Sequence, residues 1–455
     1  MYLPPAFIEQ MQNMLGSDFS DFEASLAENA PVSIRLNPNK MTRNWEAEQI
    51  AWHPDAYYLA ERPVFTLDPS FHAGTYYVQE ASSMFVAEAV KQLVDLDQPL
   101  RVLDLCAAPG GKSTLLLSLL NDRSFLLSNE VIKHRYHILQ ENLAKWGRSN
   151  VAISNHDPKD FKALTGFFDV VVVDAPCSGE GLFRKDLKAR QEWSTNAVEH
   201  CAARQKRILT AAQTLVKPNG LLIYCTCTYN RQENDENVEW LTQNYAFQSE
   251  ALSIPKTWNI TERSVDGKHY YQFFPHRTKG EGFFLSCLRN TGHHSAKSPK
   301  RRKHAPKTSF EKITKSTSSL LPAFVAQHED YDFLQDQLEN IHAFPKALGA
   351  DFRTLAQVLP RISLGTTIGT VKGKNLVPAT PLAMSPLVSH DLPELKLNHS
   401  QALHFLKKIP FTYEATTQAW HWVTYEGNGL GWAKILKNRM NNYYPKHWRI
   451  RMEIE

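Results

Sequence analysis

The sequence predicts an α/β protein built on a mostly parallel sheet with helices on both faces. Two observations predict it. Short apolar runs typical of buried strands alternate with helical segments between residues 101 and 245. The chemically unusual residues all follow the ends of those runs, where open α/β sheets bind ligands. The composition, with 42% hydrophobic and 22% charged residues, is that of an ordinary globular protein.

The elements of this sheet follow one another in a regular order. The predicted strands are 102–105, 124–130, 151–157, 167–174 and 221–229. The predicted helices are 113–120, 133–146, 194–216 and 231–245. Residues 218–220, Pro-Asn-Gly, are expected to close the third helix. Residues 270–290 predict two antiparallel edge strands around a Gly-containing loop.

Changes in composition predict four regions along the 455 residues. Residues 1–97 mix helical and extended patterns, which indicates a small α+β domain, and 98–290 hold the sheet. Residues 291–318 are polar, basic and almost free of bulky apolar side chains, as expected of a flexible linker. Residues 319–455 begin with a helical stretch and then become β-rich, with frequent Gly and Pro.

The net charge of +4 is small, but the basic residues are unevenly distributed. Residues 297–307 carry six Lys or Arg and no acid, and residues 434–451 carry six more among aromatic residues. Basic residues among aromatic ones suit a nucleic acid, whereas the alternative is a solvated surface that keeps the protein soluble. The residues predicted to contact the nucleic acid are Lys434, Lys437, Arg439, Tyr443, Tyr444, Lys446, Trp448 and Arg449.

Several classes of protein are not expected. No apolar run approaches the roughly 18 residues of a membrane helix, and the N-terminal stretch lacks the basic region of a signal peptide. The six cysteines have no Cys-x-x-Cys spacing, so free thiols in a cytoplasmic protein are expected. His134 and His137 share a helix face without a third ligand, so no metal site is predicted. No obligate protein partner is evident.

The turn after the first strand of the sheet predicts a ligand site that is not a phosphate site. Counting back from Gly-Lys-Ser, Cys106 stands where a P-loop requires its first glycine. Free backbone N–H groups at such a turn can still hold a small polar ligand, although an ordinary tight connection is the alternative. The residues of this turn are Cys106, Ala107, Ala108, Pro109, Gly110, Gly111 and Lys112.

Two acids on the same rim extend the predicted site. Glu130 ends the second strand, where an acid accepts hydrogen bonds from a ribose diol, and Asp157 ends the third, where it can take an adenine amino group. Helix capping or a solvent-facing charge is the alternative for each acid. Together with the turn they predict a site for an adenosine-containing ligand without a phosphate requirement, which S-adenosylmethionine fits.

Two cysteine loops on this rim supply reactive groups. Asp174 and Cys177 lie in Asp-Ala-Pro-Cys-Ser-Gly-Glu-Gly, and Cys225 and Cys227 lie in Tyr-Cys-Thr-Cys-Thr-Tyr. A cysteine near a helix N-terminus can act as a nucleophile, although a single strand-end cysteine is more often a packing residue. Methylation of a pyrimidine at C5 needs such a set, because C5 becomes nucleophilic only after a thiolate adds at C6. The base must also be unstacked, which favours a single-stranded or extruded target.

The ordered motifs resemble those of the RNA cytosine-5 methyltransferase family. They are DLCAAPGGK at 104–112, DAPCSGEG at 174–181, TCTYNRQENDENVEWL at 226–241 and GEGFFLSCLR at 280–289, with SIRLNPNK and YYVQEASSMFVAEAV before them. The resemblance covers roughly residues 30–290. It implies a Rossmann-like class I methyltransferase fold, an N-terminal domain that binds RNA, and S-adenosylmethionine as cofactor.

The resemblance also implies roles for single residues. Cys227 would be the nucleophile, Cys177 would assist release of the methylated RNA, and Asp174 would engage the cytosine ring. The cofactor contacts would be the turn from 106 to 112, Glu130, Asp157 and Asp174. Cys225 stays open as an alternative nucleophile, because strand alternation sends both thiols of this loop to the same side.

The tail from residue 365 resembles, more weakly, the C-terminal RNA-binding extension of the bacterial small-subunit rRNA methyltransferases of this family, which includes a PUA-like domain. Residues 427–432 are expected to form a hairpin turn that presents the basic and aromatic segment. The tail therefore favours 16S rRNA, free or in the small ribosomal subunit, over tRNA as substrate. A non-catalytic ribosome-assembly factor is the third hypothesis, and it predicts a damaged active rim.

Overall fold

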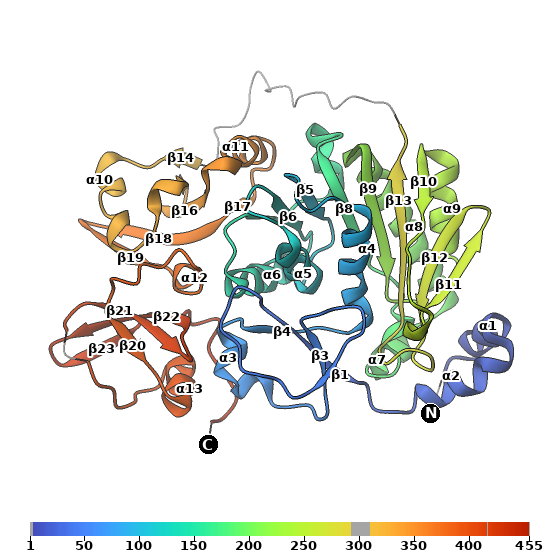
Figure 1. Cartoon of the computed structure of the whole chain (residues 1–455), viewed down its shortest axis with the longest axis horizontal. Coiled ribbons are helices and arrows are strands. Elements are labelled where there is room, and N and C mark those ends of the chain that lie inside the picture. Colours follow the sequence, from blue (N-terminus) through green and yellow to red (C-terminus); the bar gives the residue numbers. More distant parts are fainter. Residues whose placement is uncertain (1–2, 293–309, 416, 455) are drawn as a thin grey trace.

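The computed structural model describes residues 3–292, 310–415 and 417–454 (Figure 1). A ten-stranded mixed sheet forms the centre of the molecule. A four-stranded sheet from the N-terminal residues, and a five-stranded and a four-stranded sheet from the C-terminal residues, lie around it. Within these ranges no helix is both long and apolar enough to cross a membrane.

Five neighbouring strands of the central sheet are parallel. They are β5 (Arg101–Asp104), β6 (Phe125–Asn129), β7 (Val151–Ser154), β8 (Phe168–Asp174) and β9 (Val216–Thr226). The chain adds β6 and β7 on one side of β5, and then returns to add β8 and β9 on the other side. The topological switch point therefore lies between β5 and β8, and ligands of such sheets bind at the carboxyl ends of the strands there.

Antiparallel strands extend the sheet at both edges, and the predicted fold class is confirmed. Beside β9 lie β13 (Phe283–Asn290), β12 (Lys268–Phe273) and β11 (Thr261–Val265), and β10 (Phe247–Glu250) also pairs with β13. At the other edge β17 (Ile362–Leu364) pairs with β7. This last strand was not expected, because it comes from the C-terminal region, more than 200 residues after its partner.

Helices cover both faces of the central sheet. On one face lie α4 (Phe85–Leu93), α5 (Gly111–Leu119) and α6 (Lys133–Trp146). On the other lie α8 (Thr195–Leu215), α9 (Asp235–Asn244) and α11 (Gly349–Val358). Val170 and Val172 pack into the first layer and Val171 and Val173 into the second. The strands read as unbroken apolar runs because both of their faces are buried.

The helix boundaries follow local capping signals. Helix α6 begins and ends where the sequence predicts, and Gly147 closes it in a left-handed conformation with a φ of 86°. Helix α8 starts after Ser194, whose hydroxyl accepts a hydrogen bond from the backbone N–H of Ala197. The residues expected to close α8, Pro218 to Gly220, instead lie in an irregular first half of β9.

The N-terminal residues form three helices and a small antiparallel sheet. The helices are α1 (Pro5–Leu15), α2 (Phe19–Ser25) and the short α3 (Pro69–His72). The strands are β1 (Val32–Leu36), β2 (Glu48–Gln49), β3 (Ala56–Leu59) and β4 (Tyr76–Val78). Helix α4 also precedes the predicted boundary at residue 97, but it packs against the central sheet.

Arg35 on β1 joins the N-terminal sheet to helix α5. Its buried guanidinium donates hydrogen bonds to the hydroxyl of Thr114 (2.6 Å) and to the carbonyl of Gly111 (3.4 Å). The guanidinium also lies 4.5 Å from the ring centroid of Trp146. The N-terminal sheet thereby fixes the first turn of α5, which follows the Gly-Gly turn.

The C-terminal residues form two further sheets, on the left in Figure 1. The first contains β14 (Phe310–Lys312), β15 (Tyr331–Asp336), β16 (Asn340–Pro345), β18 (Thr366–Lys372) and β19 (Asn375–Pro378), with α10 (Lys315–Ser318) and α12 (Thr380–Ala383). The second contains β20 (Glu394–Lys396), β21 (Trp420–Tyr425), β22 (Asn428–Leu436) and β23 (Arg439–Asn442), with α13 (His399–Lys407).

The predicted linker is shorter than expected. Residues 293–309, which include the basic stretch 297–307, lie outside the described residues. Residues 310–318 were also expected to be linker, and this is wrong, because they form β14 and α10. Phe310 is buried in the core layer beside α11, so β14 is held by packing despite the polar sequence around it.

Candidate active site

A cavity of about 490 Å³ opens at the carboxyl ends of β5, β6, β7 and β8. The structure brings most of the predicted site residues to its walls: Cys106, Ala108, Glu130, Asp157, Asp174, Cys177 and Cys227. Ala107, Pro109, Gly110, Gly111 and Lys112 belong to the same turn but do not line the cavity. The cavity therefore spans the switch point and reaches both cysteine loops.

The Gly-Gly turn owes its shape to Gly110. This residue has a φ of 117°, which L side chains rarely adopt, and a Cβ there would lie 3.2 Å from a methyl group of Leu139. Helix α5 begins at the next residue, so its first turn points toward the switch point. The glycine thus lets the chain turn sharply from β5 into α5.

Asp104, at the end of β5, is a residue that the sequence analysis did not single out. Its carboxylate is fully buried, and Ser113 donates a hydrogen bond to Oδ2 at 2.6 Å. Oδ1 has no hydrogen-bond partner among the described residues. Burial raises the pKa of Asp104 to about 7. Asp104 does not line the cavity, and its hydrogen bond to Ser113 instead holds the first turn of α5 against the end of β5. Its place as a strand-end acid was the available signal.

Replacing Asp104 with Asn should change how stability depends on pH. Below pH 4 the carboxyl is protonated in both the folded and the unfolded chain. Between pH 4 and pH 7 the unfolded chain loses this proton while the folded chain keeps it, so the native protein loses stability as pH rises. The free energy of unfolding of Asp104→Asn, relative to the native protein, should therefore rise by about 2–3 kcal/mol between pH 5 and pH 8 in urea titrations. A pH-independent difference would contradict the raised pKa.

Lys112 places a positive charge beside Asp174. The two form an ion pair at 2.8 Å, with side chains 13% and 32% exposed. Burial disfavours the charge of Lys112, but the carboxylate of Asp174 outweighs it and holds the pKa of Lys112 above its usual value. The ammonium also lies 5.1 Å from the ring centroid of Phe283. Asp174 is thereby held at the cavity wall.

Glu130 and Asp157 lie on the α6 side of the cavity. Glu130 is almost completely buried, and its carboxylate accepts a hydrogen bond from the backbone N–H of Ile132 at 2.8 Å. Asp157 caps the short 3-10 helix Pro158–Leu164 by accepting from the backbone N–H of Lys159 at 3.1 Å. Asp157 therefore caps a helix, which was the alternative to a ligand-binding role for this acid. It also lines the cavity.

The two thiols of Cys177 and Cys227 touch. Their Sγ atoms are 3.0 Å apart, and the backbone N–H of Cys227 points at the sulfur of Cys177 at 3.4 Å. They meet because β8 and β9 are parallel neighbours that end together. The contact with the Cys227 thiol, together with burial, holds the pKa of Cys177 well above its ordinary value. Cys177 therefore stays protonated at neutral pH and can donate a hydrogen bond to its neighbour.

Cys225 lies apart from this pair. It is fully buried, and its sulfur lies 3.7 Å from the carbonyl of Val173 and 3.8 Å from Oδ1 of Asp174. Burial raises its pKa well above the ordinary value of a thiol. The expectation that Cys225 and Cys227 share one side rested on strand alternation, but β9 ends at Thr226, before the second cysteine. Only Cys227 of the two lines the cavity.

Two buried glutamates, which the sequence analysis quoted only as parts of motifs, connect the cysteine loops. Glu180, in the first loop, accepts a hydrogen bond from the backbone N–H of Tyr229 in the second at 2.8 Å. Glu233, after the second loop, accepts from the backbone N–H of Ser178 in the first at 3.0 Å. Each carboxylate thus holds the other loop's backbone, which fixes the distance between the two thiols.

Further basic residues lie at the mouth of the cavity. Arg204 and Arg207 on α8 are exposed and line it. They are three residues apart, so they lie on the same face of the helix. The sequence prediction placed the basic contacts only in the tail and left out these two arginines. Their spacing on a predicted helix beside the active site was the signal for them.

The predicted RNA residues of the tail lie on and after β22. Lys437, Arg439, Tyr443, Lys446 and Arg449 are exposed, and Lys434 and Trp448 are half-buried. The prediction for Tyr444 is wrong, because its ring is 1% exposed and packs against Phe405 in the core of this sheet. The predicted hairpin is present, but its turn lies at Glu426 and Gly427, both with positive φ, and residues 428–432 belong to β22.

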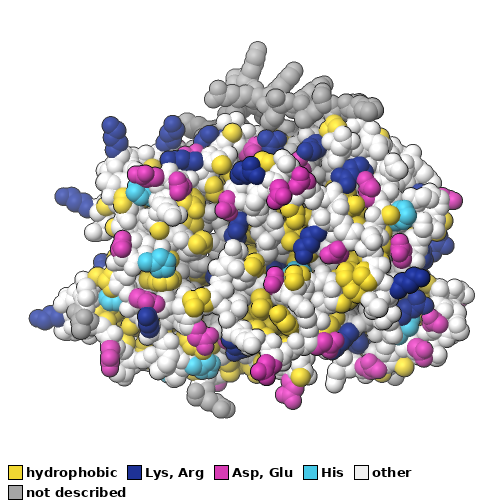
Figure 2. Space-filling view, in the orientation of Figure 1, with side chains coloured by type: hydrophobic (Ala, Val, Ile, Leu, Met, Phe, Trp, Pro, Cys, Tyr) yellow, Lys and Arg dark blue, Asp and Glu magenta, His cyan; other side chains and the backbone are white. Residues whose placement is uncertain are grey.

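The charges on the outer surface are mixed. Figure 2 shows Lys and Arg side chains interspersed with acidic ones over the face that it presents. No group of three His, Cys, Asp or Glu side chains within residues 3–292, 310–415 and 417–454 is arranged to hold a metal ion.

Comparison with family models covers most of the chain. The model described as 16S rRNA methyltransferase RsmB/F matches residues 91–289. The model of the N-terminal domain of 16S rRNA methyltransferase RsmF matches residues 3–81, and that of the methyltransferase RsmF PUA domain matches residues 392–450.

Curated relatives carry the same name. Ribosomal RNA small subunit methyltransferase F of Pectobacterium atrosepticum is 35% identical over 307 residues, which cover 64% of this chain and 63% of that protein. This chain therefore matches less than two thirds of that relative's length. The protein of that name from Citrobacter koseri is 28% identical over 473 residues, covering 98% of this chain and 96% of the relative.

Solved structures share the fold. PH0851 is 28% identical, with a TM-score of 0.57, over 63% of this chain and 66% of that one. NSun6 from Pyrococcus horikoshii with SFG is 19% identical, with a TM-score of 0.55, over 64% of this chain and 99% of that one.

The switch-point cavity and these likenesses define a Rossmann-like methyltransferase. Within that class, the chain matches models of a catalytic domain, an N-terminal domain and a PUA domain. Residues 91–289 belong to the methyltransferase domain of the RsmB/F family, and residues 3–81 and 392–450 match the N-terminal and PUA domains described for RsmF.

Proposed function

We propose that this chain transfers a methyl group from S-adenosylmethionine to C5 of a cytosine in 16S rRNA through a covalent bond between cysteine and the base. Family membership supports the methyl transfer. The observation that carries the chemistry is the 3.0 Å contact between the sulfur atoms of Cys177 and Cys227 on the wall of the switch-point cavity. Free thiols paired in this way suit nucleophilic addition to a pyrimidine ring.

The residues present fit an S-adenosylmethionine site. The Gly-Gly turn, Glu130, Asp157 and Asp174 would hold the cofactor, and the acids that line the cavity suit a cationic ligand. The cofactor, when bound, would supply an electrophilic methyl group. Glu130 would orient the ribose by accepting hydrogen bonds, and the turn would exclude water from the methyl group.

Cys227 would start the reaction at the base. Its thiolate forms a bond to C6, and the π electrons of the C5–C6 double bond move to C5. C5 would then form a bond to the methyl carbon, while the bond from that carbon to the donor's sulfonium sulfur breaks and its electron pair stays on sulfur, which leaves as a neutral thioether. Loss of the C5 proton to a base returns an electron pair to the ring, which breaks the bond between sulfur and C6 and restores the double bond. A covalent intermediate replaces one difficult step with several easier ones.

Asp174 and Cys177 would serve the remaining steps. Asp174, held by the 2.8 Å ion pair with Lys112, accepts a hydrogen bond from the cytosine edge. Cys177 keeps its proton because contact with Cys227 and burial raise its pKa. It would donate a hydrogen bond to the departing sulfur of Cys227 and so favour release of the methylated RNA.

The substrate part of the proposal rests on the relatives, which are named as small-subunit rRNA enzymes, and on the match to a PUA domain. The test is to incubate the full chain with labelled S-adenosylmethionine and either 16S rRNA or tRNA transcripts, and to identify the labelled nucleoside by mass spectrometry. We expect 5-methylcytidine from 16S rRNA only. Label confined to tRNA would support the tRNA alternative, and absence of label from either RNA and from assembled subunits would contradict the proposal.

A further inference from the structure

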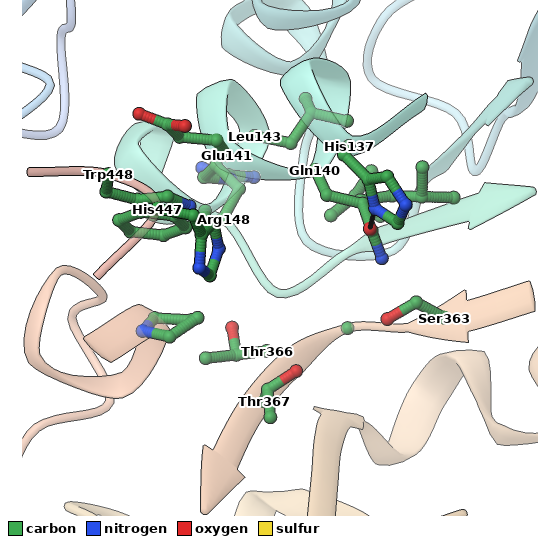
Figure 3. A pocket seen from close by; sticks show the side chains of 16 residues that line it. His137, Gln140, Glu141, Leu143, Arg148, Ser363, Thr366, Thr367, His447 and Trp448 are labelled. Carbon is green, nitrogen blue, oxygen red and sulfur yellow. Dashed lines mark hydrogen bonds between the residues drawn. The ribbon is translucent and has the colours of Figure 1, made fainter. Parts of the chain in front are cut away.

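A second cavity, of about 580 Å³, lies between the methyltransferase sheet and the C-terminal sheets. Helix α6 forms one side, and β17 and β18 form the opposite side. Figure 3 shows His447 and Trp448 at one end, His137 and Ser363 at the other, and Thr366 below. Nothing in the proposed methyl transfer uses this cavity. Its size is that of a small-molecule or nucleotide site.

One end of the cavity offers an aromatic surface. Trp448 is half-buried, so one part of its indole packs in the core of the C-terminal sheet while another faces the cavity. The imidazole of His447 lies beside it, with ring centroids 5.9 Å apart. Aromatic faces of this kind stack on nucleobases without regard to sequence.

The polar groups of the cavity are short of partners. Within the part of the chain that the structure describes, the hydroxyls of Ser363 and Thr366 and the imidazole of His447 make no hydrogen bond to protein. Thr366 is only 5% exposed as a residue, so its hydroxyl has little access to solvent beyond the cavity. Donors and acceptors placed in this way suit the polar edge of a base or a ribose.

The wall behind Trp448 carries basic side chains, of which Arg148 lines the cavity, while burial lowers the pKa of Lys40 to about 7. The ammonium of Lys145 lies 5.7 Å from the indole centroid, and Lys40 donates a hydrogen bond to the carbonyl of Lys145 at 2.6 Å. Only Glu141 pairs with Lys145 there, at 2.6 Å. Arg148 lines the same wall, and its acidic partner Asp122 is 90% exposed and well solvated. Basic side chains on this wall suit a polyanion.

We propose that this cavity, hereafter the α6 pocket, binds an unpaired nucleotide of the RNA substrate, with the base stacked on Trp448 and its polar edge on Thr366 and Ser363. The pocket is a second anchor that holds the RNA while another nucleotide enters the catalytic cavity. The proposal rests on the proposed function for the identity of the RNA.

Helix α6 links the two cavities. Its first turn contributes Arg135 to the catalytic cavity, and Ala144, near its end, lines the α6 pocket. These residues are nine positions apart, which is about 14 Å along a helix. At about 100° per residue they point to opposite sides of α6, so an RNA strand that reaches both cavities would cross the exposed face of the helix at His137 and Ile138.

The test is photocrosslinking and binding with the full chain. A 16S rRNA transcript that contains 4-thiouridine is bound and irradiated, and the crosslinked peptides are mapped. We expect crosslinks within residues 444–450 and 363–367. In filter binding of the same transcript, Trp448→Ala should raise the dissociation constant roughly tenfold, as expected for the loss of one stacked base. Ser363→Phe, which fills the pocket and keeps the indole, should weaken binding similarly.

Trp240→Ala is the matched control, because Trp240 is half-buried on α9, away from α6, and should leave the dissociation constant unchanged. Native RNA affinity in both pocket variants, or crosslinks that avoid both segments, would overturn the α6 pocket as an RNA site. Methyl transfer by the native chain is measured in parallel. If RNA is methylated but the pocket variants bind normally, only this inference fails. If crosslinks map to the pocket but 16S rRNA is not methylated, only the proposed function fails.

Discussion

Replacing Cys227 with Ala is expected to lower the rate of methyl transfer by roughly a thousandfold or more, which corresponds to about 4 kcal/mol in activation free energy. The reason is that C5 of cytosine becomes nucleophilic only after a sulfur atom adds at C6, and Cys227 is the sulfur on the cavity wall that we propose for this step. Transfer of tritiated methyl groups to 16S rRNA under single-turnover conditions measures the effect.

Cys225→Ala is the matched control for this variant. Cys225 lies two residues before Cys227, but its thiol is buried in the sheet and does not reach the cavity. We expect Cys225→Ala to keep activity within a few fold of the native value. Full activity in Cys227→Ala, with loss of activity in Cys225→Ala, would reverse the assignment of the nucleophile.

Replacing Cys177 with Ala should trap the enzyme on its RNA. The first bond, from Cys227 to C6, does not need Cys177, so methyl transfer should proceed once. Release should then slow, because the thiol that lies 3.0 Å from the departing sulfur and stays protonated is gone. We expect a protein–RNA adduct that survives denaturing electrophoresis, with the label from the methyl group in the same band.

The double variant, with both cysteines replaced by Ala, separates this outcome from nonspecific binding. It should show no adduct, because no sulfur remains to form one. An adduct in the double variant would contradict the chemistry, and rapid turnover by Cys177→Ala without any adduct would remove the proposed role of Cys177 in release.

The central sheet was predictable from the sequence because its strands are buried on both faces. The run Val170 to Val173 fills two layers at once, so it reads as a strand without any alternation. The placement of the site followed from the same fact, since the ends of parallel strands meet on one rim. Half of the predicted cofactor residues accordingly share a cavity, and the other half belong to the turn beside it.

Contacts between distant segments were not predictable in the same way. Strand β17 is three residues long and gains its place only by pairing with β7 and burying Ile362 and Leu364. Tyr444 lies in a basic and aromatic stretch typical of an RNA surface, yet tertiary packing turns its ring inward. The bond between Glu180 and the backbone of Tyr229 also depends on the folded arrangement of two loops. The order of residues within any one of these segments does not show which distant segment it will contact.

The proposed reaction depends on a bond between the sulfur of Cys227 and a cytosine ring, and this bond can be trapped. In 16S rRNA that contains 5-fluorocytidine, fluorine replaces the C5 hydrogen, so no proton can be removed and the adduct should persist on the native enzyme. The adduct is digested and its peptide is fragmented in a mass spectrometer, since Thr226 alone separates Cys225 from Cys227 and no protease site lies between them. We expect the nucleotide on Cys227. A nucleotide on Cys177 or Cys225, or no adduct from an RNA that the enzyme methylates in its native form, would contradict the proposed reaction.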